Sequence, residues 1–357
     1  MRRLTVLQLL PALGSGGVEK STLEIGAALV QAGHRSIVIS AGGRMLDALQ
    51  RAGSEHITLD IGRKSLSTLR HAWTLRRLIR QLQPDIVHAR SRLPAWLAWL
   101  AMRGIGGGRP HFVTTVHGLN SPGWYSSIMT RGDRVICVSG SVRAHVLSNW
   151  PDTKAAKLTV IERGVDTDLF CPAPGPLTLI DATRRLLMPG RGTRLKGHEA
   201  ALTLLADLRR AGCDARLWLL GTHEPGREAY VAELEALADT LGVADALEIS
   251  PPRHDVIAAY RQSDLVLQLS AKPEAFGRTV VEALASGVPV VGWAHGGVGE
   301  LLARYFPDGQ VAPGDRQALL ATTLSVLGKA PVLPPLQAQS LAQMQAQTLK
   351  VYESLLD

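Results

Sequence analysis

Short apolar runs alternate with longer segments of helical period along almost the whole of this chain. Strands are predicted at Leu4–Leu10, Ser36–Ser40, Asp85–Ala89, Phe112–His117, Arg134–Val138, Leu158–Ile161, Arg185–Met188, Ala215–Leu220, Ala246–Ile249, Asp264–Leu269 and Val288–Gly292. Helices are predicted at Val18–Gly33, Leu66–Leu82, His198–Ala211, Glu228–Leu241, Asp315–Leu327 and Leu341–Leu356. Strands joined through helices run parallel, so the pattern predicts an α/β fold with helices covering parallel sheets.

The alternation is interrupted once, by the Pro-rich stretch 171–176, and then restarts. A length of 357 residues suits two domains of ordinary size. We therefore expect one doubly wound domain over 1–170, a second over 171–335, and a closing segment with one helix over 336–357. No run of eighteen apolar residues occurs, so no transmembrane helix is expected. Three cysteines without paired spacing favour a reducing compartment over a disulfide frame or a zinc site.

The segment from Asp264 to Gly292 is the most informative for function. It reads strand, loop, helix, strand, with Glu274 in the loop and Glu282 one to two turns into the helix. Ligands of such sheets bind outside the carboxyl ends of the strands. Both carboxylates can therefore face one ligand, with the free amides around Gly277 between them. This arrangement suits a ligand with hydroxyls at its two ends and phosphate in the middle.

Two Gly-rich loops join a strand to a helix. In Gly190–Gly197, the cations Arg191 and Lys196 stand beside a helix N-terminus, which suits a diphosphate. The other loop, Gly14–Ser21, also allows a ligand to approach the backbone, but a plain tight turn explains it equally well. Glu19 occupies a position where both a P-loop and a dinucleotide fingerprint require glycine, so neither motif is present.

Two further motifs have competing interpretations. His117 ends a strand before Gly118, where a structural role and a functional role are both open. The pair Asp166 and Asp168 has metal-binding spacing, but a turn is the favoured interpretation. No other His, Cys or Asp cluster has ligand spacing, so no metal site is predicted.

The net charge of +8 is unevenly distributed. Residues 1–170 hold 22 Lys and Arg against 11 Asp and Glu, whereas the remainder carries a net charge of −3. Trp73, Trp96 and Trp99 are interleaved with the arginines. The first half therefore suits an anionic partner, such as the surface of an anionic membrane leaflet. The competing interpretation is that these Trp residues belong to the core and the Arg residues to a solvated helix face.

The ordered set of motifs resembles that of the family-4 retaining glycosyltransferases of the GT-B type, over nearly the whole chain. The matching residues are Gly16, Gly17, Glu19, His117, Gly118, Val138–Ser141, Gly164–Asp166, Phe170, Arg191, Lys196, Glu274, Glu282, Gly296–Glu300, Met344, Val351 and Tyr352. One departure is that Glu162-Arg163 stands where the family usually has Pro-Asn. The resemblance implies two doubly wound Rossmann-like domains, with the active site in the cleft between them and the closing helix packed back on the first domain.

The resemblance also implies roles for individual residues. Arg191 and Lys196 would neutralise the leaving diphosphate, Glu282 would bind the ribose hydroxyls, and Glu274 and His117 would lie at the donor sugar. The other residues implied to bind the donor are Gly16, Gly17, Arg253, Phe276, Gly277, Arg278 and Thr279. Of these, Arg253 belongs to the loop 251–254, which is expected to contact the base.

The implied function is transfer of a sugar, with retention, from a nucleotide-diphosphate sugar to a cell-surface glycan or glycolipid acceptor such as lipopolysaccharide core. No metal cofactor is expected, UDP is favoured over GDP, and nucleic acid is not expected as a partner. The segment Arg90–Trp96 resembles bacterial enzymes acting on such acceptors. The expected location is the cytoplasm, peripheral to the inner face of the inner membrane. A nucleotide-sugar epimerase of the same architecture and a non-catalytic nucleotide-binding partner in glycan assembly remain as alternatives, whereas a dehydrogenase would need the missing third glycine.

Overall fold

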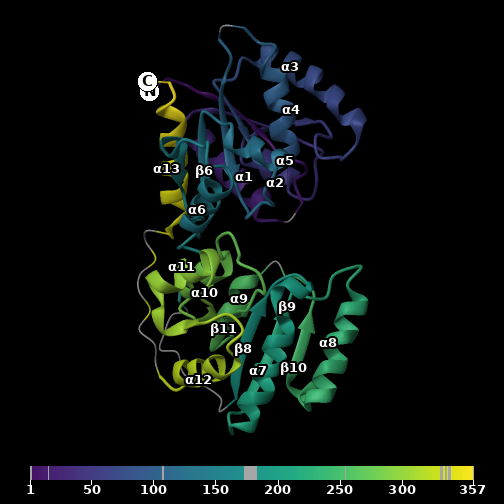
Figure 1. Cartoon of the computed structure of the whole chain (residues 1–357), viewed down its shortest axis with the longest axis vertical. Coiled ribbons are helices and arrows are strands. Elements are labelled where there is room, and N and C mark those ends of the chain that lie inside the picture. The colour runs from purple at the N-terminus through teal and green to yellow at the C-terminus, as the bar shows by residue number, and fades with distance from the viewer. Residues whose placement is uncertain are drawn as a thin grey trace. The chain divides into compact units, whose positions relative to one another are not determined.

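The computed structural model of the chain describes residues 2–14, 16–106, 108–172, 183–253, 255–329, 333, 336 and 339–356. The chain forms two compact units (Figure 1). Unit 1 consists of residues 1–163 and 341–357, and unit 2 consists of residues 164–340. The final helix therefore belongs to the same unit as the first strand.

Unit 1 is built on a seven-stranded parallel sheet with the order β3-β2-β1-β4-β5-β6-β7. Its strands are β1 (Thr5–Leu9), β2 (Arg35–Ser40), β3 (Glu55–Thr58), β4 (Ile86–Ala89), β5 (His111–Val116), β6 (Arg134–Cys137) and β7 (Leu158–Val160). The strand order reverses at β1, which pairs with β2 on one side and β4 on the other. Such a reversal leaves a crevice at the carboxyl ends of these strands, where doubly wound sheets bind their ligands.

The helices of unit 1 include one that is distant in sequence. They are α1 (Gly17–Gln31), α2 (Leu46–Arg51), α3 (His71–Leu82), α4 (Arg92–Met102), α5 (Trp124–Ser127), α6 (Gly140–Asn149) and α13 (Leu341–Glu353). Met344, Val351 and Tyr352 of α13 are buried in one apolar cluster with Leu4, which directly precedes β1, and with Ile25 of α1. Burial of such side chains contributes about 1.5–3 kcal/mol each, so α13 completes the core of this unit.

Unit 2 repeats the plan with a six-stranded parallel sheet of order β10-β9-β8-β11-β12-β13. Its strands are β8 (Arg184–Pro189), β9 (Ala215–Leu220), β10 (Leu247–Ser250), β11 (Leu265–Gln268), β12 (Val290–Trp293) and β13 (Gln310–Val311). Its helices are α7 (His198–Arg210), α8 (Glu228–Leu241), α9 (Val256–Arg261), α10 (Arg278–Ala285), α11 (Gly296–Tyr305) and α12 (Arg316–Leu327). Here the order reverses at β8, so β8 and β11 lie side by side although their sequences are far apart. The predicted α/β class with two doubly wound units is confirmed.

Every predicted strand is present, within two residues of its expected ends, and the structure adds two more. β3 was missed because it lies at the sheet edge, where no residue of Glu55–Thr58 is fully buried and no apolar run is needed. β13 was missed because it has only two residues. The helix predicted over Leu66–Leu82 is divided into a 3₁₀ turn, Leu66–Arg70, and α3, which begins at His71.

The division between the units falls at Arg163/Gly164, earlier in the chain than the boundary expected at 170/171. The reason is that the segment after Arg163 packs on unit 2. The amide of Val165 donates to the carbonyl of Gln339 (2.8 Å), and the ring of Phe170 lies edge-on to that of Tyr260. Residues 173–176 of the Pro-rich stretch lie outside the described residues. Within the described part of the chain, no helix is both long and apolar enough to cross a bilayer.

Candidate active site

The carboxyl ends of β8 and β11 bring together two residues that are distant in sequence. Nζ of Lys196, in the loop after β8, donates to Oε1 of Glu274, in the loop after β11, at 2.7 Å. Each side chain keeps about a quarter of its surface exposed, 25% and 24% respectively. A fixed cation and a fixed carboxylate thus lie together at the switch point of this sheet, where a ligand can reach both.

Glu274 is held by polar neighbours as well as by Lys196. The hydroxyl of Ser270 donates to Oε1, and the side-chain amide of Gln268 donates to Oε2 (3.3 Å). The same amide of Gln268 donates to Oγ1 of Thr279 in the first turn of α10 (3.0 Å). The carboxylate therefore has a defined orientation, because three donors contact it, one from the loop after β8 and two from the end of β11.

The loop that carries Lys196 is seated on β11 through a glycine. Gly197 has a φ of +82°, and a Cβ at this position would lie 1.9 Å from the carbonyl oxygen of Leu269. The amide of Ala271 also donates to the carbonyl of Leu195 (2.8 Å). Only glycine allows this approach, and the approach brings Lys196 within reach of Glu274.

Arg191 lies in the same loop as Lys196 and is exposed. Its guanidinium makes no hydrogen bond or ion pair with any residue that the structure describes. By contrast, Arg194 of this loop pairs with Glu199 (3.2 Å) and with Glu233. Arg191 is thus a cation that an anionic ligand can bind without displacing a carboxylate.

The start of α10 adds backbone donors to this edge. Gly277 caps the helix with a φ of +106°, a conformation that favours glycine. Phe276 beside it is buried, with 6% of its surface exposed. The first amides of a helix have no partner within the helix, and the helix dipole makes them attractive to anions.

Glu282, on the same helix, is a buried carboxylate with 8% of its surface exposed. The hydroxyl of Tyr260 donates to Oε2 (3.0 Å), and Nε of Arg278 lies 3.6 Å from Oε1. Arg278 also donates to the carbonyl of Gly164 (3.1 Å). Burial, and next the charge of Glu282, raise the pKa of Tyr260 well above its ordinary value, so its hydroxyl stays a donor.

The predicted residues of unit 1 gather around the start of α1 and the end of β5. Gly16 caps α1 with φ near −88°, and Gly17 is its first residue, so neither needs the left-handed region. His117 follows β5, and its Nδ1 accepts from Nη2 of Arg163 at 2.8 Å. Arg163 in turn donates to the hydroxyl of Ser21 on α1 (2.7 Å). The structure thus connects His117 to α1 through a buried arginine.

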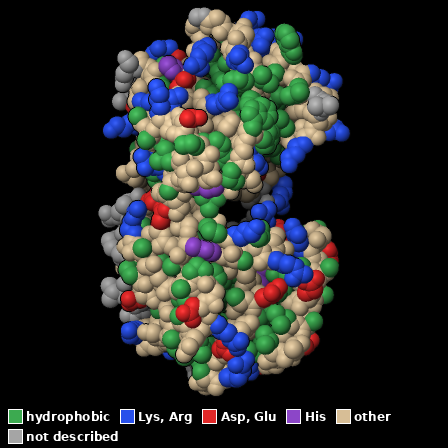
Figure 2. Space-filling model, in the orientation of Figure 1, with side chains coloured by type: hydrophobic (Ala, Val, Ile, Leu, Met, Phe, Trp, Pro, Cys, Tyr) green, Lys and Arg blue, Asp and Glu red, His purple; other side chains and the backbone are tan. Residues whose placement is uncertain are grey.

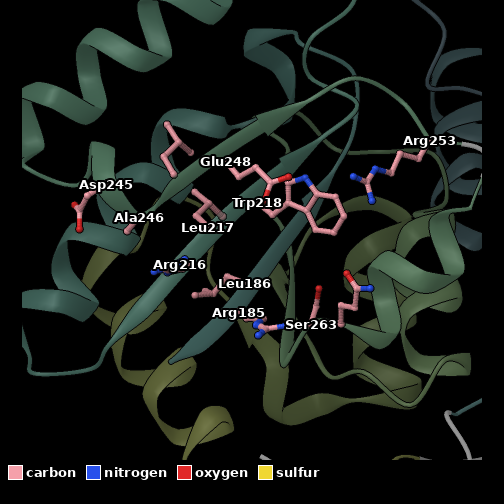
Figure 3. A pocket seen from close by; sticks show the side chains of 12 residues that line it. Arg185, Leu186, Arg216, Leu217, Trp218, Asp245, Ala246, Glu248, Arg253 and Ser263 are labelled. Carbon is pink, nitrogen blue, oxygen red and sulfur yellow. The ribbon is translucent and has the colours of Figure 1, made fainter. Parts of the chain in front are cut away.

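Arg253 lines a cavity whose described lining residues do not include Lys196 or Glu274. Its guanidinium stacks 5.0 Å from the ring centroid of Trp218, which donates to the hydroxyl of Ser250 (2.7 Å). Figure 3 shows both side chains at a cavity of about 340 Å³ on the β8–β10 sheet. Of the predicted site residues, only Arg253 is among the described residues that line it. His254, the last residue of the predicted base-binding loop, lies outside the described residues.

The Asp166–Asp168 pair forms a turn. Oδ1 of Asp166 accepts from the amides of Asp168 (3.1 Å) and Leu169 (3.3 Å), which is the hydrogen bonding of an Asx turn. Among the described residues, no group of three His, Cys, Asp or Glu side chains is arranged to hold a metal ion.

Sequence reasoning missed the residues that orient this site. Ser270 and Gln268 orient Glu274, Tyr260 contacts Glu282, and Arg163 contacts His117. The signal for Gln268 was a polar side chain inside an apolar strand, since it is buried with 3% exposed. The signal for Arg163 was its departure from the family's usual asparagine.

Two family models match the chain in succession. The model described as "Glycosyltransferase Family 4" matches residues 15–169, and that described as "Glycosyl transferases group 1" matches residues 177–331. The two matched regions fall largely in unit 1 and unit 2 respectively.

Curated relatives agree with this assignment. The chain is 32% identical over 178 residues to the D-inositol 3-phosphate glycosyltransferase of Mycobacterium sp. (strain KMS), a match that covers 48% of this chain and 39% of the relative. The corresponding protein of Actinosynnema mirum is 29% identical over 274 residues, covering 70% of this chain and 65% of that protein. The first of these matches spans only about two-fifths of the relative's length.

Solved structures match over the whole chain. A glycosyltransferase from Rickettsia africae ESF-5 is 29% identical, with a TM-score of 0.85 and complete coverage of both chains. Anabaena Alr3699/HepE is 20% identical with a TM-score of 0.80, covering 99% of this chain and 100% of that one, and it shares the fold. Two glycosyltransferase family models, the first of them that of family 4, thus match the chain in order over most of its length, and its two units have the fold of GT-B glycosyltransferases.

Proposed function

We propose that this chain transfers a sugar, with retention of anomeric configuration, from a nucleotide-diphosphate sugar to an anionic glycan or glycolipid acceptor. The observation that carries the proposal is the Lys196–Glu274 pair at the carboxyl ends of β8 and β11, with Arg191 and the start of α10 beside it. This cluster offers positive charge for a diphosphate and a carboxylate for sugar hydroxyls at one sheet edge.

Lys196, Arg191 and the first amides of α10 stabilise the leaving group in this mechanism. Cleavage of the bond between the anomeric carbon and the diphosphate oxygen builds negative charge on that oxygen. Removal of one fixed donor that points at developing charge typically lowers kcat about 10²–10³-fold, which corresponds to about 2.7–4 kcal/mol of transition-state stabilisation. Lys196 and Arg191 supply the positive charge that a divalent metal supplies in other phosphoryl-bearing sites.

Glu274 and His117 act at the donor sugar. Two donors contact Oε1 of Glu274 and one contacts Oε2, which leaves one lone pair, on Oε2, for a sugar hydroxyl. The acceptor hydroxyl attacks the anomeric carbon from the face that the diphosphate leaves. Its proton passes to the departing phosphate oxygen, so the glycosidic bond forms as the old one breaks, and configuration is retained.

Glu282 and Arg253 serve the nucleoside in this proposal. In this proposal the carboxylate of Glu282, which contacts Tyr260 and Arg278, accepts from the ribose hydroxyls, and Arg253 contacts the base. UDP is favoured as the nucleotide, because structures of Anabaena Alr3699/HepE, which shares the fold, contain UDP and UDP-glucose.

The surface of unit 1 supports an anionic acceptor at a membrane. Trp73 of α3 and Trp124 of α5 are 72% and 70% exposed, whereas Trp96 is buried with 7% exposed and belongs to the core. The arginines that stack on aromatic rings in this region are Arg76, Arg92, Arg103 and Arg131. Figure 2 shows Lys and Arg side chains around exposed hydrophobic ones on the unit that carries α3. Each basic residue near an anionic leaflet contributes about 1 kcal/mol, and exposed Trp side chains suit the lipid interface.

Two acceptor classes fit this surface. One is a lipid-linked saccharide at the cytoplasmic face of the inner membrane. The lipopolysaccharide galactosyltransferase WaaB shares the fold, at 15% identity and a TM-score of 0.78. The other is a small phosphorylated polyol, as the name of the mycobacterial relatives indicates. Sedimentation with vesicles of phosphatidylglycerol, compared with phosphatidylcholine alone, separates them: only the first predicts binding to the anionic vesicles.

Calorimetric titration with UDP and GDP, each with magnesium or with EDTA, tests the donor assignment. We expect UDP to bind with equal affinity in both conditions, and Arg191→Ala to weaken binding about tenfold or more. Arg194→Ala is the matched control, because it removes a cation of the same loop that is already paired with Glu199 and Glu233. Equal effects of the two substitutions would contradict the diphosphate assignment, and loss of UDP binding in EDTA would contradict metal independence.

An epimerase of this architecture and a non-catalytic subunit make different predictions. A transferase releases UDP from UDP-sugar faster when acceptor is present. An epimerase converts the donor without acceptor, and a non-catalytic partner binds nucleotide without turnover.

A further inference from the structure

Arg163 occupies a buried position that connects α1 with the end of β5. It is 8% exposed, and its guanidinium donates to Oγ of Ser21 (2.7 Å) and to Nδ1 of His117 (2.8 Å). A third contact reaches Sδ of Met344 on α13 (3.9 Å). The side chain is therefore held by several elements of unit 1, and its direction toward His117 is fixed.

The contact with Arg163 determines where the imidazole proton of His117 lies. A guanidinium has only donors, so Nδ1 of His117 must be the acceptor. The hydrogen of the neutral ring is then on Nε2. Burial, and next the charges of Arg163 and Arg90, lower the pKa of His117 well below its ordinary value, so the neutral ring prevails at pH 7.

The Nε2–H of His117 is thereby left as a donor without an acceptor. Nε2 is buried and has no hydrogen-bond partner among the residues that the structure describes. A buried donor without an acceptor costs about 1–3 kcal/mol and is rare in folded proteins. Such a cost at the carboxyl end of a strand in a doubly wound sheet indicates that a ligand supplies the acceptor.

His88 shows that this sheet can satisfy both nitrogens of a buried histidine. It lies on β4, the strand that pairs with β5. One ring nitrogen, Nδ1, contacts the hydroxyl of Tyr352, and the other, Nε2, contacts the hydroxyl of Thr115, both at 2.7 Å. The unsatisfied Nε2 of His117 is thus particular to its position.

We propose that Arg163 is a positioning residue that fixes His117 in the Nε2–H tautomer, so that Nε2 donates a hydrogen bond to an oxygen of the transferred sugar. The assignment of a sugar oxygen as the acceptor rests on the function proposed above, whereas the assignment of the His117 tautomer does not. The family usually has asparagine at the position of Arg163, and asparagine has a shorter side chain without a guanidinium. The residue that fixes the tautomer of His117 in this chain is therefore a departure from the family's usual sequence.

The tautomer is measured directly by ¹⁵N–¹H correlation spectroscopy of the histidine rings in the ligand-free protein. We expect the His117 ring to be neutral, with its hydrogen on Nε2 and an unprotonated Nδ1 that accepts a hydrogen bond. A hydrogen on Nδ1 would overturn the proposal without any variant. This readout needs no substrate, so it stands or fails separately from the assignment as a transferase.

Substitutions then test the action of Arg163 through His117. Arg163→Met removes the donor at similar volume, and we expect mixed tautomers and a loss of about tenfold or more in kcat. Arg163→Lys keeps a donor and should restore much of both. Ser21→Ala removes another hydrogen-bond partner of Arg163 and should leave the His117 tautomer unchanged. If Arg163→Met leaves the tautomer as in the wild type, the proposal is wrong.

A double-mutant cycle separates positioning from a merely structural role. His117→Gln places an amide donor near the Nε2 position without a tautomer to fix. In this background, Arg163→Met should change kcat by no more than about twofold. A loss as large as in the wild-type background would show that Arg163 acts through the fold and would overturn the proposal.

Discussion

Gly197→Ala is the substitution that most directly tests how the fold positions Lys196. Two costs follow from the structure. The φ of +82° disfavours any residue with a Cβ by about 1–2 kcal/mol. The new Cβ would also lie 1.9 Å from the carbonyl oxygen of Leu269, which belongs to the backbone at the end of β11 and cannot rotate away. Overpacking of this kind costs about 1–3 kcal/mol more.

Gly212→Ala is the matched control for the backbone cost alone. Gly212 follows α7 in the same unit with a φ of +81°, and a Cβ there would meet nothing within 4 Å. The control should therefore lose about 1–2 kcal/mol, whereas Gly197→Ala should lose about 2–5 kcal/mol. For a unit of this size, 1 kcal/mol shifts the melting temperature by about 2–4 °C. Gly197→Ala should thus melt about 2–12 °C below the control.

Calorimetric melting and UDP titration together decide the outcome. Relief of the overlap moves the loop away from β11, so Lys196 no longer reaches Glu274 and UDP affinity falls in Gly197→Ala but not in Gly212→Ala. Equal melting temperatures for the two variants would refute the close approach. Normal UDP affinity in a destabilised Gly197→Ala protein would refute the link between this glycine and the cation.

Three further predictions concern charge, a buried hydrogen bond and pH. Lys196→Met should lower kcat, measured as UDP release, about 10²–10³-fold, because it removes a cation from the leaving group. The control Arg194→Ala should leave kcat near the wild-type value. A loss in kcat of less than about tenfold for Lys196→Met would contradict the leaving-group role. Tyr352→Phe should lower the free energy of unfolding by about 1–3 kcal/mol in urea, because it leaves a buried nitrogen of His88 unsatisfied; no change would mean that the contact is not formed. In the folded protein, burial, and next the charge of Lys196, lower the pKa of His198 to about 4. In the unfolded chain the pKa of a histidine is about 6.5, so as the pH falls below this value the unfolded chain binds a proton that the folded protein does not. Stability should therefore decrease by about 3 kcal/mol between pH 6.5 and 4, and His198→Asn should remove that part of the slope.

Periodicity predicted the architecture because an inner strand that is buried on both faces is a nearly continuous apolar run. Asp264–Leu269 and Arg134–Val138 are examples, and both appear as inner strands, β11 and β6. The same reasoning could not find β3, because an edge strand is stabilised by backbone pairing and leaves its side chains partly exposed. Sequence patterns also could not place the domain boundary. Composition identifies the Pro-rich stretch 171–176, but it does not show on which unit the residues before this stretch pack.

The sequence indicates candidate site residues, but it does not indicate the contacts between them. Lys196 and Glu274 were each expected to contact the donor, one at the diphosphate and the other at the sugar. Their ion pair depends on β8 lying beside β11, and the strand order follows from the reversal of the sheet, which local sequence does not encode. The partners Gln268 and Ser270, by contrast, lie at the end of β11 and in the loop that carries Glu274, so their contacts depend on the conformation of that loop.

The ion pair also changes what the two residues do in the proposed reaction. Both side chains are partly exposed, so their pairing contributes little to stability, about 1 kcal/mol or less. A diphosphate can therefore recruit Lys196 at small cost, and Glu274 keeps Ser270 and Gln268 as donors when this happens. The carboxylate then remains oriented for the sugar while the cation follows the charge that develops on the phosphate. The pair is thus better understood as a resting arrangement of the donor site than as a structural salt bridge, because it orients Lys196 toward Glu274 but is weak enough for a diphosphate to replace the carboxylate.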